Sequence, residues 1–98
     1  MKIKIIKVTG NSLYPDIRNG DYLIILKVRK FMKLKPGDVI VFNHREYGRM
    51  VKSIKVMNDD GVSFLVEGKN QLSIDSNQLG RVYLDDIDGK MIFHIPRN

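Results

Sequence analysis

Apolar and polar residues alternate along most of the chain with a period of two, and turn residues interrupt the alternation every few positions. This pattern is typical of β-strands, whose side chains point in turn to opposite faces of a sheet. It predicts strands over residues 2–8, 22–28, 39–43, 49–57, 62–67, 81–84 and 90–95. The run from Leu23 to Leu26 is uninterrupted and apolar. We therefore expect the second strand to be buried on both faces.

Turn signals separate these strands. Lys35-Pro36-Gly37-Asp38 predicts a turn, because proline presets φ and glycine accepts positive φ. Asn58-Asp59-Asp60-Gly61 predicts a hairpin turn, and the last two strands are expected to pair around residues 85–89. We find no repeat, linker or long helical periodicity. The pattern predicts one domain over residues 1–98 with an all-β fold, as a small antiparallel barrel or two packed sheets.

Composition narrows the class of protein. The 98 residues are 43% hydrophobic, which is enough to build one core. The absence of cysteine excludes disulfides and thiolate metal sites. No apolar run approaches the ~18 residues that span a bilayer, and the start of the chain lacks the apolar centre of a signal peptide. We expect a chain with no transmembrane segment, cytoplasmic or peripheral to a membrane.

The net charge of +6 is compatible with a polyanion, an anionic membrane surface, or solubility alone. Basic residues are densest over residues 27–35, where Phe31 and Met32 lie among them. This stretch is expected either to be a solvated hairpin or to rest on a membrane surface through Phe31, Met32 and the nearby lysines.

A candidate nucleophile is Ser12, in the segment Gly10-Asn11-Ser12-Leu13-Tyr14-Pro15. The glycine allows an unusual φ, and the proline stiffens the chain that follows. Such a loop exposes a hydroxyl beside backbone N–H groups that could stabilise an oxyanion. The alternative interpretation is an ordinary turn, because a serine hydroxyl needs a base to become nucleophilic.

A candidate base is Lys52, which lies among Met50, Val51 and Ile54. Strand alternation places it on the same face as Met50 and Ile54, and that face is expected to be buried. Burial disfavours the charged ammonium and lowers the pKa of a lysine, which allows it to act as a general base. Alternatively, the side chain extends along a sheet edge to reach solvent.

The two histidines, His44 and His94, compete for the role of base, and a Ser-His-Asp triad stays open because triad order is not fixed by sequence. No carboxylate lies at a sequence position that would orient either ring. The isolated histidines and scattered carboxylates have no metal-ligand spacing, so neither a metal nor another cofactor is expected. A late segment rich in hydroxyls and amides, residues 68–82, either satisfies its own backbone or supplies a hydroxyl that positions a neutral lysine.

These segments, in this order, resemble the serine-lysine peptidases of the signal peptidase I clan, which includes the self-cleaving repressor domains. The family's nucleophile box matches residues 10–15, followed by Gly20-Asp21; its Lys-Pro-Gly-Asp turn matches residues 35–38; and its lysine position matches Lys52. Its late box matches Gly68-Lys69-Asn70 and Ser73-Ile74-Asp75-Ser76, an arrangement that favours the signal-peptidase branch. Lys69 and Asn77 stand where the family has aspartate and arginine.

The resemblance implies an all-β serine endopeptidase without a cofactor, in which Ser12 attacks a peptide carbonyl while Lys52 takes its proton. It implies that Ser73 hydrogen-bonds the lysine amine, with Asp75 and Ser76 supporting the late box. The backbone of Gly10, Asn11 and Ser12 would form the oxyanion region. Leu13 and Tyr14 are expected to contact substrate, which would be a protein or peptide carrying an N-terminal leader.

Two other function classes compete with the peptidase. A basic β-barrel could bind nucleic acid or an acidic surface without catalysis, but its aromatic residues are too dispersed for a stacking platform, so nucleic acid is disfavoured. The changes at Lys69 and Asn77 also allow a peptidase fold that has become an inactive scaffold.

Overall fold

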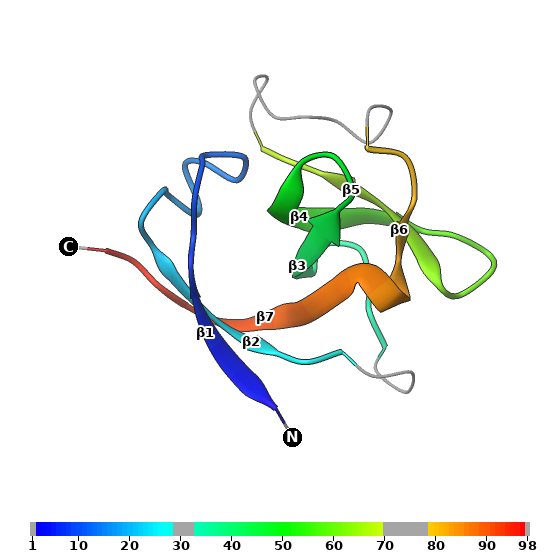
Figure 1. Ribbon diagram of the computed structural model, residues 1–98, viewed down its shortest axis with the longest axis horizontal. Helices are drawn as coiled ribbons and strands as arrows, with labels where there is room; N and C mark the ends of the chain where they lie inside the picture. The colour runs from blue at the N-terminus through cyan, green and yellow to red at the C-terminus, as the bar shows by residue number, and fades with distance from the viewer. Residues whose placement is uncertain (1, 29–32, 70–78, 98) are drawn as a thin grey trace.

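The computed structural model describes residues 2–28, 33–69 and 79–97 (Figure 1). The elements with defined bounds are seven strands and one 3-10 helix. They are β1 (Ile3–Lys7), β2 (Tyr22–Leu26), β3 (Val39–His44), β4 (Gly48–Met57), β5 (Ser63–Glu67), β6 (Val82–Tyr83), η1 (Leu84–Asp86) and β7 (Ile87–Ile95). The predicted all-β class is confirmed, and each predicted strand corresponds to an observed one.

All seven strands belong to one antiparallel sheet, in the order β1-β2-β7-β3-β4-β5-β6. The C-terminal strand therefore lies in the middle of the sheet, between β2 and β3, as Figure 1 shows for the orange ribbon. Among the described residues β1 and β6 form the two edges. The sheet is continuous, yet it encloses two separate clusters of buried side chains.

The predicted pairing of the last two strands is wrong. β6 pairs with β5, through Ser63 with Tyr83 and Phe64 with Val82, whereas β7 pairs with β2 and β3. The 3-10 helix η1 separates β6 from β7, and β7 then runs between β2 and β3. Residues 85–89, which were expected to connect this pair of strands, instead belong to η1 and to the start of β7, where Ile87 is buried against the core.

The two clusters lie on opposite faces of β3 and β4. Ile40 and Phe42 join one cluster, and Val41, which alternates with them, joins the other. The first cluster is built mainly from the β3–β6 side of the sheet: Leu34, Ile40, Phe42, Ile54, Phe64, Val66, Leu79, Val82 and Ile87. The second is built mainly from the β1–β2 side: Ile6, Val8, Leu13, Ile17, Leu23, Ile25, Val41 and Val51.

The expectation that β2 is buried on both faces is wrong. Leu23 and Ile25 are fully buried in the second cluster, but Ile24 and Leu26 on the other face are only half-buried, and Tyr22 is exposed. A continuous apolar run in the sequence therefore does not mean that both faces of this strand are covered: among the described residues, the outer face of β2 is only partly buried.

The predicted turn at Lys35–Asp38 is confirmed and fixes the position of β4. Gly37 has φ of +94°, and the Asp38 N–H donates to the carbonyl oxygen of Lys35 at 3.1 Å. Two hydrogen bonds then join the turn to Ile54 of β4: the Gly37 N–H donates to the Ile54 carbonyl, and the Ile54 N–H donates to the Asp38 carbonyl, both at 2.8 Å. The turn is therefore bonded to β4 at Ile54, two residues after Lys52.

Candidate active site

The loop that carries Ser12 joins β1 to β2 and is closed by hydrogen bonds at its base. Gly20 N–H donates to the Val8 carbonyl at 2.8 Å, and Val8 N–H donates to the Asp21 carbonyl at 2.7 Å. Gly10 has φ of +93°, a conformation that strains other residues, and its N–H donates to the side-chain oxygen of Asn19 at 2.9 Å. The unusual φ that the sequence predicted for Gly10 is confirmed.

Ser12 lies against β4. Its hydroxyl donates to the carbonyl oxygen of Val51 at 3.0 Å, and Val51 immediately precedes Lys52. The two residues are 39 positions apart in sequence, so this contact depends on the tertiary fold. The structure thus brings the predicted nucleophile beside the strand segment that carries the predicted base.

Lys52 is fully buried, with none of its surface exposed. It pairs in register with Ile40 on β3, and β4 lies in the interior of the sheet between β3 and β5. Strand alternation places its side chain on the face of Met50 and Ile54, which is the face of the first cluster. The prediction of burial is confirmed, and the alternative in which Lys52 reaches solvent at a sheet edge is wrong.

A buried carboxylate, Asp21, anchors the end of the Ser12 loop. It accepts hydrogen bonds from the backbone N–H of Arg97 at 2.9 Å and of Arg18 at 2.8 Å, and from the ring of His94 at 2.7 Å. These bonds, those from the two backbone groups foremost, lower the pKa of Asp21 from its ordinary 3.8 to about 2, against the opposing effect of burial. Because Asp21 is then ionised, His94 Nε2 is the donor.

The expectation that no carboxylate orients a histidine is therefore wrong for His94. Asp21 and His94 are 73 positions apart, and only the placement of β7 beside β2 brings them together. The pair links the Ser12 loop to the C-terminal strand. In sequence, the only signal was the position of Asp21 after a glycine and before an apolar strand.

Lys69 contacts the Ser12 loop twice. Its backbone N–H donates to the carbonyl oxygen of Ser12 at 2.6 Å, and its Nζ forms an ion pair with Asp16 Oδ2 at 2.5 Å. Both charged side chains are about half exposed. Lys69, one of the two departures from the family's late box, thus contacts the nucleophile loop directly, which the sequence did not reveal.

The two residues expected to contact substrate differ in environment. Leu13 is buried in the second cluster, where it anchors the loop, whereas Tyr14 is 48% exposed and precedes Pro15 through a cis peptide bond. Only Tyr14 of the two therefore presents its side chain at the surface. The expected roles of Ser73, Asp75 and Ser76, and of Phe31 and Met32, concern positions outside the described residues.

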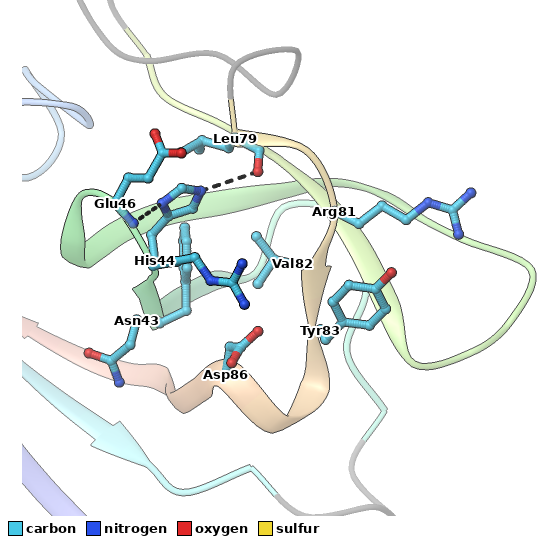
Figure 2. Close-up of a pocket in the computed structure, with 10 residues that line it drawn as sticks. Asn43, His44, Glu46, Leu79, Arg81, Val82, Tyr83 and Asp86 are labelled. Atoms are coloured by element: carbon cyan, nitrogen blue, oxygen red, sulfur yellow. Dashed lines mark hydrogen bonds between the residues drawn. The ribbon is translucent and has the colours of Figure 1, made fainter.

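His44 stabilises the turn between β3 and β4. Its Nδ1 accepts the backbone N–H of Glu46 at 3.0 Å and of Tyr47 at 3.3 Å, so the proton of the neutral ring lies on Nε2, which contacts the Leu79 carbonyl at 3.3 Å (Figure 2). The ring forms one wall of a cavity of about 400 Å³. Its other walls include Arg45, Leu79, Arg81, Val82, Tyr83 and Asp86, and neither Ser12 nor Lys52.

Two further searches cover only the residues that the structure describes. Within residues 2–28, 33–69 and 79–97, no group of three or more histidine, aspartate or glutamate side chains is placed to hold a metal ion. No helix in the same ranges is long and apolar enough to cross a membrane.

The chain is an all-β domain in which the Ser12 hydroxyl contacts the carbonyl of Val51, the residue before the buried Lys52. A model of the Peptidase S24-like family matches residues 2–92. The chain therefore belongs to the Peptidase S24-like family. No curated protein matches the chain.

Proposed function

We propose that the protein is a serine endopeptidase in which Ser12 is the nucleophile and Lys52 the general base. We further propose that it removes a leader or propeptide from a partner protein, as in the signal-peptidase branch of the clan. The observation that carries the proposal is the contact of the Ser12 hydroxyl with the Val51 carbonyl, one residue before a fully buried lysine. Membership of the Peptidase S24-like family supports it.

The chemistry follows from these positions. The neutral amine of Lys52 takes the hydroxyl proton as Ser12 Oγ attacks the scissile carbonyl, forming a tetrahedral oxyanion. Backbone N–H groups in the segment from Gly10 to Ser12 would donate to that oxygen, as the family resemblance implies. The Lys52 ammonium then returns its proton to the leaving amine, and water hydrolyses the acyl ester. Ser73 would orient the amine.

The environment of Lys52 suits a base and not a surface cation. Met50, Ile54 and the register partner Ile40 lie on the same sheet face as Lys52, and burial disfavours the charged ammonium. In the resting protein the Ser12 hydroxyl is held by a backbone carbonyl, so substrate binding has to redirect it toward the amine. A peptide segment would pass Tyr14, the exposed side chain of the loop.

A test that needs no natural substrate is acylation by p-nitrophenyl acetate. We expect one acetyl group on the Ser12 side chain, located by peptide mapping, with release of p-nitrophenol. Ser12→Ala should abolish this modification, and Lys52→Met should slow it by about 10²–10⁴-fold, the usual contribution of a general base.

Two matched variants control for the substitutions. Ser53→Ala removes a buried hydroxyl from β4, next to Lys52. Lys55→Met removes an exposed lysine from the same strand. Both should retain the wild-type rate. Acylation of Ser12 at an undiminished rate in Lys52→Met would disprove the role of Lys52, and no acylation of Ser12 in the wild type would disprove the nucleophile.

Removal of a leader is tested in cells. N-terminal peptides are compared between cells that express the wild type and cells that express Ser12→Ala. The proposal predicts at least one partner whose mature N-terminus depends on Ser12. Identical N-termini in the two strains, together with normal acylation in vitro, would reject leader removal while leaving the peptidase chemistry in place.

A further inference from the structure

The segment Asn19-Gly20-Asp21 ends the Ser12 loop, and hydrogen bonds join it to the beginning of the same loop. The Gly20 N–H donates to the carbonyl oxygen of Val8, and the Val8 N–H donates to that of Asp21. These two bonds close the loop between the end of β1 and the start of β2. They fix its two ends, but Ser12 lies further along the loop, so its position depends on other contacts.

Asn19 contacts the two residues that precede the nucleophile. Its side-chain Oδ1 accepts a hydrogen bond from the Gly10 N–H at 2.9 Å, and its backbone N–H donates to Asn11 Oδ1 at 3.3 Å. Gly10 has φ of +93°, so the chain turns at the residue that Asn19 holds. Because Asn11 is joined directly to Ser12, these two bonds constrain the direction from which the backbone reaches the nucleophile.

Ser12 is held at other atoms by segments outside the loop. Its hydroxyl donates to the Val51 carbonyl at 3.0 Å, and its carbonyl oxygen accepts the Lys69 N–H at 2.6 Å. These partners act on the side chain and on the C-terminal side of Ser12, whereas Asn19 acts on the N-terminal side. Loss of the Asn19 side chain therefore leaves both other contacts in place and changes one side only.

The position of Asn19 is supported in turn by the buried carboxylate of Asp21, which is 1% exposed. That carboxylate accepts the backbone N–H of Arg18 at 2.8 Å, the backbone N–H of Arg97 at 2.9 Å and the ring of His94 at 2.7 Å. Arg18 immediately precedes Asn19, so the bond to Arg18 makes the backbone at Asn19 depend on Asp21. Through His94 and Arg97 it also depends on the C-terminal strand.

We propose that Asn19 is a positioning residue for acyl transfer by Ser12, and that Asp21 and His94 support it. This inference rests on the peptidase chemistry proposed above. Stabilising an oxyanion requires backbone donors in a fixed orientation, and an error of about 1 Å in the placement of reacting groups can lower a rate about 10²-fold. Asn19 would fix the Gly10–Ser12 backbone in this way without touching the substrate.

A positioning role differs from a purely structural one in what the side chain contributes to folding. Asn19 is exposed, whereas the loop is anchored in the second cluster by Leu13 and Ile17, both of which are buried. A hydrogen bond at an exposed position contributes little to stability, because water replaces the lost partner. Loss of the Asn19 side chain should therefore affect acylation much more than it affects unfolding.

The first experiment measures acylation of Ser12 in the full chain over a series of p-nitrophenyl acetate concentrations. Asn19→Ala removes the acceptor for the Gly10 N–H and should lower the limiting acylation rate about 10–100-fold at an unchanged half-saturating concentration. Asn19→Asp is isosteric, keeps the acceptor oxygen and should recover a large part of the rate. Asn43→Ala removes another exposed asparagine, on β3, and should retain the wild-type rate.

A second experiment tests the support from the C-terminal strand. His94→Leu removes the side-chain donor to Asp21 and should lower the limiting rate, by less than Asn19→Ala does. His94→Gln keeps a donor near the place of Nε2 and should recover the rate. Amide hydrogen exchange at Gly10, followed by NMR, should become faster in Asn19→Ala and in His94→Leu and should stay at the wild-type rate in Asn43→Ala.

The outcomes separate this inference from the proposed function. Acylation of the wild type and of Asn19→Ala at the same limiting rate would overturn the inference and leave the peptidase chemistry in place, and so would equal losses in Asn19→Ala and Asn19→Asp. A change in the half-saturating concentration alone would assign Asn19 to substrate binding. A loss that follows the unfolded fraction, measured by circular dichroism, would assign it to folding. No acylation of Ser12 in the wild type would overturn the proposed function and this inference together.

Discussion

The two sides of the sheet differ in how completely they are covered. Around β3 and β4 both faces are packed, one by each cluster of buried side chains, and Lys52 is enclosed there. Around β1 and β2 the described residues pack mainly on the inner face, and the outer face carries exposed apolar side chains such as Ile5 and Phe93. The comparison separates two environments of apolar side chains: one set encloses the amine of Lys52, and the other remains exposed on the outer face.

The candidate site lies at β4, the strand that has one cluster on each of its faces. Val51 belongs to the second cluster, and strand alternation turns Lys52 toward the first. The Ser12 loop is anchored in the second cluster through Leu13 and contacts β4 at Val51. Nucleophile and base therefore depend on different parts of the core, and the strand β4 joins them.

The largest expected difference between the two sides comes from two phenylalanines. Phe64 is 2% exposed in the first cluster, and Phe93 is 60% exposed on the outer face. Phe64→Ala should lower the free energy of unfolding by about 3–5 kcal/mol, and Phe93→Ala should change it by less than about 0.5 kcal/mol. Chemical denaturation measures both. Similar losses in the two variants would contradict the view that the outer face contributes little to folding.

A smaller effect is expected from Asp21, and it depends on pH. Its pKa in the folded protein, about 2, lies below its ordinary 3.8, so the unfolded chain binds a proton more readily than the folded one. The stabilisation is complete above about pH 4 and is lost as the pH falls toward 2. Asp21→Asn should therefore unfold at a lower temperature at neutral pH, and its difference from the wild type should shrink in acid.

Thermal unfolding of both proteins from pH 7 to pH 2 checks this prediction. Asp60 also has a lowered pKa, mainly because the Ser63 hydroxyl donates to it, and so it titrates in the same direction. Because Asp60 is present in both proteins, the difference between them isolates Asp21. A difference that stays constant down to pH 2 would show that the ionised carboxylate of Asp21 is not what stabilises the loop.

The smallest expected effect concerns the ion pair of Lys69 with Asp16, which joins the late segment to the Ser12 loop. Exposed ion pairs contribute about 0.2–1 kcal/mol, and salt screens them. Lys69→Glu and Asp16→Lys should each destabilise slightly, and the double variant should recover most of the loss. A double-mutant cycle at low and high salt measures the coupling; an undetectable coupling at low salt would mean that the backbone bond from Lys69 to Ser12 suffices.

The sequence predicted the local features well, because they depend on residues close together in the chain. The strand alternation, the glycine turns and the burial of Lys52 could all be inferred in this way. Contacts between distant segments could not. The position of β7 between β2 and β3 gave no local signal in the sequence. Without it, neither the bond of Asp21 to His94 nor the partial exposure of the outer face of β2 could be inferred.

The candidate site shows the same contrast between features that are local in sequence and contacts between distant segments. Family motifs indicated Ser12 and Lys52, but the contact through Val51 depends on how the loop docks on β4. Lys69 stood out only as a departure from the family, since nothing near it in the sequence points to Asp16, which is 53 positions away.

The most direct test of the central claim is an NMR titration of the Lys52 amine in the folded protein, with Ser12→Ala as a second sample. We expect burial to lower the pKa of Lys52 below the ~10.4 of a free lysine, so that a neutral base is available for Ser12. The shift should persist in Ser12→Ala, because it arises from the core. A pKa at the ordinary value in both samples would contradict the assignment of Lys52 as the base.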